Sequence, residues 1–176
     1  MGSISARLWL ATLVALLAAC GPEAALSELD REQIFAAAAA SGAAAFTAAE
    51  NHTEIRIDVI DTIGRPREDE NSMLRFPEDA QFSESQRDAI VAALAPLSVV
   101  FVPPTVYEDP YYVTYDGLAG NVVLSIGEPI KEEGEFQIVT GLWCGPLCGS
   151  GGARQLEQLE NGTWTLTDPV GPQWVP

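Results

Sequence analysis

The stretch of residues 141–152, GLWCGPLCGSGG, carries the most evident chemistry in this sequence. Its two cysteines, Cys144 and Cys148, could bind zinc, act as a redox pair or form a structural disulfide. A zinc site needs three or four protein ligands, and the chain's single histidine, His52, lies far upstream. Redox pairs usually have two intervening residues and lie at a helix N-terminus, whereas three residues separate this pair and glycines follow it.

We therefore favour a structural disulfide and expect neither a metal nor a cofactor, with the zinc and redox hypotheses as alternatives. Closing so short a loop stabilises a fold by about 2 kcal/mol in the chain-entropy model. The closure would fix a connection that is rich in glycine, the residue that loses most conformational entropy on folding.

The remaining ionisable residues form no recognisable catalytic pattern. A Ser–His–acid triad would have to use His52, and no Gly-x-Ser-x-Gly sequence accompanies it. Asp58 and Asp61 fall on opposite faces of a predicted strand, so they do not form a carboxylate pair. We therefore expect a non-catalytic domain with a binding or structural role. The alternatives are a thiol–disulfide enzyme that uses the cysteine pair, or a hydrolase with an unrecognised site.

The proline-containing stretch 103–120 is the candidate recognition surface, because it holds all of the chain's tyrosines. Aromatic side chains are enriched in protein contacts. The competing interpretation is that they pack a long loop onto the sheet. The residues are Tyr107, Tyr111, Tyr112 and Tyr115.

The segment 25–50 is the first of two predicted helices that would position these residues. It is rich in alanine, the best helix former, and Ser27 and Asp30 have capping-box spacing at its start. Its apolar residues form no clean stripe, so a partly ordered stalk is the alternative for this segment.

The second predicted helix lies within residues 82–97. Ser83 and Gln86 form a capping box at its start, and Pro96 ends it. Its predicted apolar face consists of Ile90, Val91 and Leu94.

Several segments have the patterns of β-strands. Residues 54–63 alternate, with Ile55, Ile57 and Val59 on one face and polar residues on the other, which predicts a half-buried strand. Further strands are predicted at 98–102, 121–130 and 134–144, with a turn at 131–134, and two more strands within residues 153–168.

The last of these segments, ARQLEQLENGTWTLTD, predicts a hairpin. Asn161-Gly162 is the preferred pair for a two-residue type I′ turn. The register that such a turn imposes decides which residues face the core. It places Leu159, Trp164 and Leu166 on one face and Leu156 on the other.

The order of these elements predicts an α+β fold. A helix, a strand and a second helix precede a series of strands that hairpins could join. We expect an antiparallel sheet of about five or six strands that ends in a β-hairpin, with the helices on one face.

The N-terminus resembles that of bacterial lipoproteins. Arg7 precedes an apolar run, LWLATLVALLAA, that is shorter than the ~20 residues that span a bilayer. The residues that follow, Leu17-Ala18-Ala19-Cys20, resemble a lipobox. The resemblance implies cleavage before Cys20, lipidation of its thiol and acylation of the new amino terminus.

This resemblance divides the chain into a signal peptide (1–19), a lipidated tether (20–24) and a single α+β domain (25–176). In such lipoproteins an aspartate directly after the lipidated cysteine often retains the protein in the inner membrane. This chain has Gly21 at that position, so the resemblance implies that the protein is anchored in the outer membrane and faces the periplasm. Thiols in that oxidising space tend to form disulfides.

The C-terminal segment resembles part of a set of uncharacterised secreted proteins and lipoproteins of bacteria. Their segment has a Cys-Gly-x-Leu-Cys-Gly-x-Gly sequence, an Asn-Gly-x-Trp hairpin and a terminal tryptophan. The resemblance supports the paired cysteines and the hairpin and implies no activity. The matching residues are Cys144, Gly145, Leu147, Cys148, Gly149, Gly151, Asn161, Gly162, Trp164 and Trp174.

The charge of the chain limits its partners. It has 25 acidic and 9 basic residues and a formal net charge of −16. Such a surface repels nucleic acid, so we expect no nucleic-acid partner. The expected partners are the membrane, through the N-terminal lipid, and a protein of the envelope whose identity the sequence does not give.

Overall fold

The computed structural model describes residues 25–47, 55–63, 67–68, 74–75, 80–103, 121–145 and 148–174. Its helices are α2 (Glu28–Gly42), α3 (Ala44–Thr47) and α4 (Glu84–Leu94). Its strands are β1 (Arg56–Ile63), β2 (Arg67–Glu68), β3 (Leu74–Arg75), β4 (Ser98–Val102), β5 (Asn121–Ile126), β6 (Ile130–Glu132), β7 (Glu135–Gly145), β8 (Cys148–Gln158) and β9 (Trp164–Trp174).

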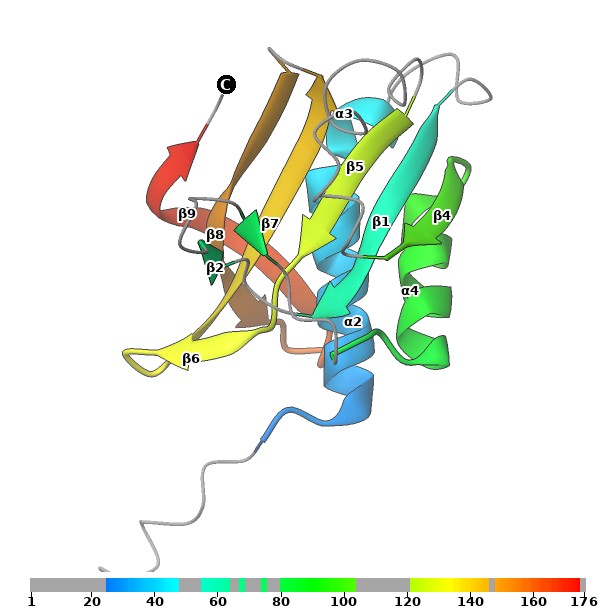
Figure 1. Cartoon of the computed structure of the whole chain (residues 1–176). Helices are drawn as coiled ribbons and strands as arrows, with labels where there is room; N and C mark the ends of the chain where they lie inside the picture. The colour runs from blue at the N-terminus through cyan, green and yellow to red at the C-terminus, as the bar shows by residue number, and fades with distance from the viewer. Residues whose placement is uncertain are drawn as a thin grey trace, which may run out of the picture.

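The predicted α+β class is confirmed, and the sheet is mostly antiparallel (Figure 1). Its strand order is β4-β1-β5-β7-β8-β9, and β6 pairs with β7. One feature of the sheet differs from the predicted antiparallel arrangement, since β1 pairs with both β4 and β5 in parallel. Parallel neighbours need a crossover, and α4 provides it between β1 and β4.

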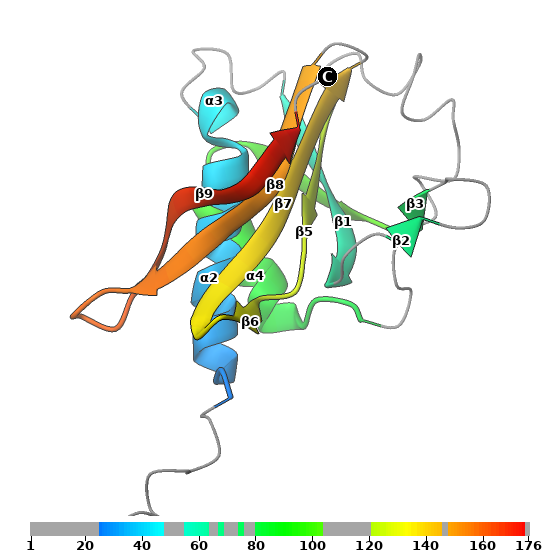
Figure 2. The ribbon, with the colours of Figure 1, turned by 90° about the vertical axis from the view of Figure 1, so that its left-hand side faces the viewer.

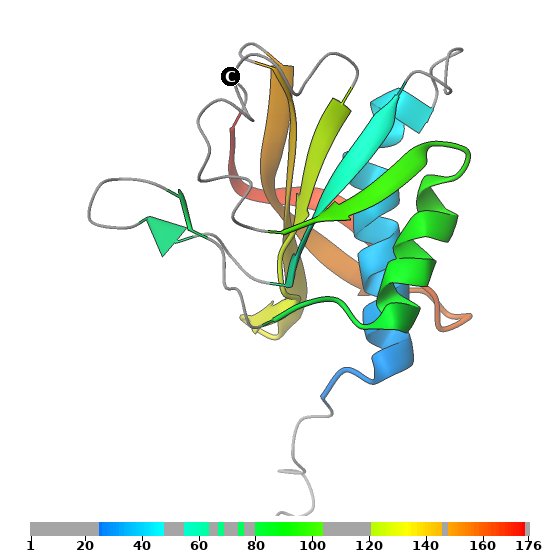
Figure 3. The same cartoon turned by 45° about the vertical axis from the view of Figure 1, so that its right-hand side comes forward.

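Helices α2 and α4 lie side by side on one face of the sheet, and the β2–β3 pair lies on the opposite side (Figures 2 and 3). The alanines of α2 let this helix approach closely, since Ala38, Ala39 and Ala43 are fully buried. At Gly42 a Cβ atom would lie 2.7 Å from Leu124 Cδ1 of β5. The stalk alternative therefore fails for α2, which is part of the core.

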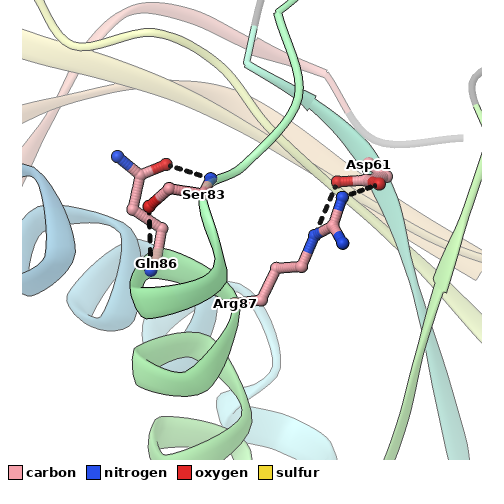
Figure 4. Close-up of polar contacts among 4 residues, drawn as sticks. All are labelled: Asp61, Ser83, Gln86 and Arg87. Atoms are coloured by element: carbon pink, nitrogen blue, oxygen red, sulfur yellow. Dashed lines mark hydrogen bonds and ion pairs between the residues drawn. The ribbon is translucent and has the colours of Figure 1, made fainter.

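Both predicted capping boxes are present. Ser27 and Asp30 begin α2, and Ser83 and Gln86 begin α4 (Figure 4). The predicted apolar face of α4 is correct for Ile90 and Leu94, which are fully buried, and wrong for Val91, which is 44% exposed. 

The prediction that β1 is half-buried is wrong, because both of its faces are buried. Ile57 and Val59 join the main core beneath the helices, while Ile60 packs with Val102 and Val123 on the other face. Asp58 is also fully buried on that second face. A strand between two parallel neighbours is typically covered on both sides, which explains the difference.

The predicted strand 121–130 is two strands. β5 ends at Ile126, and the Gly127 N–H then donates to the Val139 carbonyl. β6 includes part of the predicted turn 131–134, so the turn itself is only Glu133 and Gly134, both with positive φ. This is the pattern of a type I′ turn.

The predicted type I′ turn at Asn161-Gly162 is wrong, because only Gly162 has a positive φ. Gly162 N–H donates to the Leu159 carbonyl, and Leu159 N–H donates to the Thr163 carbonyl. This pattern fits a type I turn with a bulge at glycine. The Asn161 side chain accepts a hydrogen bond from the Thr163 N–H at 3.0 Å, an Asx-type contact that favours this geometry.

The longer loop shifts the register of the hairpin and exchanges its faces. Leu156 lies opposite Leu166, and Gln158 lies opposite Trp164. Leu156 is therefore buried beside Trp164 and Leu166 in the core, whereas Leu159 is 45% exposed. The predicted placement of the two leucines is thus the reverse of the observed one.

Candidate binding site

Cys144 and Cys148 are joined by a disulfide across the turn between β7 and β8. Their Cα atoms are 5.0 Å apart. Cys144 is partly buried and packs against the main core, while Cys148 is exposed. Both cysteines lie in strands, so neither is at a helix N-terminus, where the helix dipole would lower a thiol pKa.

The glycine-rich strand that follows Cys148 leaves a hollow on the helix side of the sheet. β7 and β8 pair in antiparallel register, with Thr140 opposite Gly152 and Leu142 opposite Ser150. Since Gly152 has no side chain, a pocket of about 210 Å³ opens between these strands and the C-terminal end of α2. Its wall also includes Ser41, Gly42, Gly151, Arg154, Pro169 and Gln173.

The side chain of Gln173 on β9 occupies the space in which a side chain of residue 152 would begin. A Cβ atom at this position would overlap the side-chain amide of Gln173. That amide nitrogen donates to the Ala153 carbonyl at 3.2 Å, so the Gln173 side chain crosses back over β8. Gly152 and Gln173 together shape one side of the pocket.

Arg154 is the basic residue of this pocket. It is partly buried, and its Nη1 donates to the Thr167 carbonyl at 3.3 Å. No carboxylate pairs with Arg154 in the described part of the chain. A guanidinium has five N–H donors, so most of its hydrogen-bonding capacity is left for another acceptor.

Three other arginines, Arg31, Arg56 and Arg87, have carboxylate partners. Arg87 forms two hydrogen bonds with Asp61 (Figure 4) and also lies 5.6 Å from the centre of the Phe101 ring. This pair ties the start of α4 to β1, which is a structural role.

Arg56 contacts both carboxylate oxygens of the buried Asp58, at 2.7 and 3.0 Å. A buried carboxylate without such a partner would be costly. Asp58 and Asp61 thus lie on opposite faces of β1, as the sequence predicted, and they have separate partners.

Asp30 has several hydrogen bonds that involve its carboxylate. The Ser27 hydroxyl donates to it at 2.6 Å, the Trp164 indole N–H at 2.8 Å and the Ser27 N–H at 3.0 Å. These contacts, of which the Ser27 hydroxyl contributes most, lower the pKa of Asp30 below its ordinary value.

Several predicted site residues lie outside the described part of the chain. They include the predicted lipidation site, the lone histidine and the tyrosine set. Among the residues that are described, no three histidine, cysteine or acidic side chains could hold a metal ion together, and no helix is long and apolar enough to cross a membrane. The residues outside are Cys20, His52, Tyr107, Tyr111, Tyr112 and Tyr115.

Neither Arg154 nor the pocket was predicted from the sequence. The available signs were the closely spaced glycines 149, 151 and 152 and an arginine two residues from Leu156, which places both side chains on the same face. The predicted register put Leu156 on the face opposite to Trp164 and Leu166, and Arg154, two residues away, shares the face of Leu156.

Comparisons with protein-family models, with curated proteins and with solved structures found no match to this chain.

Proposed function

We propose that this protein is a lipid-anchored component of the bacterial cell envelope, held in the outer membrane and facing the periplasm, whose domain binds a ligand or partner without catalysing a reaction. The lipobox-like sequence ending at Cys20 supports the anchor. The pocket beside the disulfide supports a binding role and is the observation that carries this part of the proposal.

The position of the disulfide supports a structural role for the cysteine pair. Cys144 packs against the core, and the bond closes the turn two residues beyond the pocket residues Leu142 and Ser150. Closing this turn limits how far β7 and β8 can separate at the pocket. The second candidate, a thiol–disulfide enzyme, has one observation in its favour, which is the exposure of Cys148.

Intact mass spectrometry of the chain purified from bacterial membranes tests the anchor. We expect a mass that corresponds to loss of residues 1–19 and addition of acyl chains at Cys20. A Cys20→Ala variant is the control and should lack the added mass. A soluble wild-type protein without acyl chains would contradict the proposal.

The same sample tests the role of the cysteine pair. We expect Cys144 and Cys148 to react with an alkylating reagent only after reduction. The enzyme hypothesis instead requires a reduced thiol with a pKa well below the ordinary value of about 8.5. The pH dependence of the alkylation rate measures the pKa of the reduced thiol. A thiol pKa well below about 8.5 would favour the enzyme hypothesis over a structural disulfide.

A further inference from the structure

We propose that the pocket at the C-terminal end of α2 binds a small organic carboxylate, whose carboxylate group pairs with Arg154. This inference rests on the proposed binding function and names its ligand class. It does not depend on the lipid anchor, so the two can be tested separately.

Arg154 carries a positive charge that no carboxylate of the described structure neutralises. The chain has 25 acidic residues and 9 basic ones. Arg31, Arg56 and Arg87 each lie within ion-pair distance of a carboxylate, at Glu128, Asp58 and Asp61 respectively. In such an acidic chain, a partly buried arginine that lines a pocket and pairs with no carboxylate in the described structure is suited to an anion from outside.

The lining of the pocket also favours such a ligand. Thr140 and Ser150 contribute hydroxyl groups that can donate to an oxygen atom, and Leu142 and Pro169 contribute apolar surface. A ligand with a charged oxygen end and a short apolar body matches this division. Ligand sites commonly combine apolar walls with a few polar groups that set orientation.

The size of the pocket limits the size of the ligand. The pocket has a volume of about 210 Å³, which is below the ~300–1,000 Å³ typical of sites for larger ligands. A carboxylate with only a few carbon atoms fits this volume, whereas a nucleotide does not.

The charge of the protein favours a carboxylate over a phosphate as the ligand. The planar guanidinium can bind either group through two parallel hydrogen bonds. The net charge of −16 repels a doubly charged phosphate more strongly than a singly charged carboxylate. One arginine also neutralises a carboxylate completely, and the pocket has no second basic side chain in its described wall.

NMR titration of the purified full-length chain in detergent micelles tests the proposal, with sodium propionate as the probe. We expect a saturable shift of the Arg154 Nε–H resonance. Propanamide has the same shape without the charge, and we expect it to bind at least about tenfold more weakly, because a charge-assisted pair contributes at least this factor. Inorganic phosphate should also bind more weakly than propionate.

Three variants locate the binding site. Arg154→Gln should lower the propionate affinity at least about tenfold, as read from backbone amide shifts in β7 and β8. Ser150→Leu leaves the arginine in place and should also weaken binding, because leucine fills the pocket. Arg31→Gln is the matched control, since it removes the same charge from the surface of α2, and its affinity should equal that of the wild type.

The absence of a saturable shift with propionate would overturn the proposal. Equal binding of propanamide, tighter binding of phosphate, or an unchanged affinity in a folded Arg154→Gln variant would do the same. If acyl chains are found at Cys20 while propionate fails to bind, the anchor stands and only the ligand class is wrong.

Discussion

Asp30 connects two segments that are far apart in the chain. Its carboxylate closes the capping box at the start of α2 through Ser27 and also accepts the indole N–H of Trp164 in β9. Trp164 in turn packs edge-on against Phe136, with ring centres 5.7 Å apart. One carboxylate thus fixes the start of the helix and its position against the last hairpin.

We expect Asp30→Ala and Trp164→Phe to be coupled. Each variant should be less stable than the wild type, because each removes the hydrogen bond between the two side chains. Phenylalanine keeps an aromatic ring beside Phe136, so Trp164→Phe mainly removes the donor. Urea denaturation of both single variants and the double variant should give a coupling free energy of about 1 kcal/mol. Strict additivity would contradict a direct contact.

The stability that Asp30 contributes should depend on pH in a defined direction. Its pKa is lowered in the folded protein, so the contribution is complete above the ordinary aspartate pKa of about 3.9 and is lost as the pH falls through the lower folded-state pKa. We therefore expect the stability difference between the wild type and Asp30→Ala to narrow in acid. Urea denaturation at about pH 6 and about pH 3 measures it. A difference that widens in acid would show the sign to be wrong.

At the scale of elements, the register of the β8–β9 hairpin can be tested directly. Leu156 is 5% exposed and Leu159 is 45% exposed. Leu156→Ala should therefore destabilise the protein by about 2–5 kcal/mol. Leu159→Ala is the matched control and should change the free energy of unfolding by less than about 0.5 kcal/mol. The two-residue turn that the sequence suggested predicts the reverse order.

This hairpin shows what the sequence could and could not predict. Local patterns were sufficient for both capping boxes, for β4 and for the existence of the hairpin, because neighbouring residues determine these features. The observed turn buries Leu156 in the core and packs Leu166 against it, and this tertiary packing is not contained in the local Asn-Gly pattern. One additional residue in the loop shifts the register by one position, which moves Leu156 to the buried face and Leu159 to the exposed one. The hairpin was therefore predicted correctly, but the residues that it contributes to the core were not.

The same limit explains β1 and the pocket. Alternation in residues 54–63 predicted a polar face, but two parallel neighbours and burial on both sides are properties of the sheet as a whole. The pocket combines the C-terminal end of α2 with β7, β8 and β9. Its residues are widely separated in the sequence, and only the strand register brings them together.

The turn between β7 and β8 also carries a prediction about the disulfide. Reduction of Cys144–Cys148 should lower the free energy of unfolding by about 2 kcal/mol, because the bond closes a short loop. Denaturation with and without reductant measures this, and a Cys144→Ser/Cys148→Ser double variant, which should be insensitive to reductant, is the control. An unchanged stability after complete reduction would remove the case for a structural role.

At the scale of the whole molecule, α2 separates two ends of the domain. The helix starts at Glu28, and the Trp164–Asp30 hydrogen bond holds the β8–β9 hairpin near this start. At the opposite end, α2 finishes near the end of β7 and the start of β8 (Figure 1). The pocket and the disulfide lie at this end of the domain. Fifteen helical residues span about 22 Å.

If Cys20 is lipidated, this arrangement predicts how the domain meets the membrane. The chain has seven residues between Cys20 and the start of α2, so that end should lie nearer the lipid and the pocket should face the periplasm. A paramagnetic label on the lipid headgroups should broaden the amide signals of residues 28–32 and 160–162 more than those of residues 149–152. Cys20→Ala, which lacks the anchor, should show no such difference. Stronger broadening at residues 149–152 in the lipidated protein would mean that the pocket faces the membrane, and a water-soluble carboxylate would then be hindered from reaching Arg154.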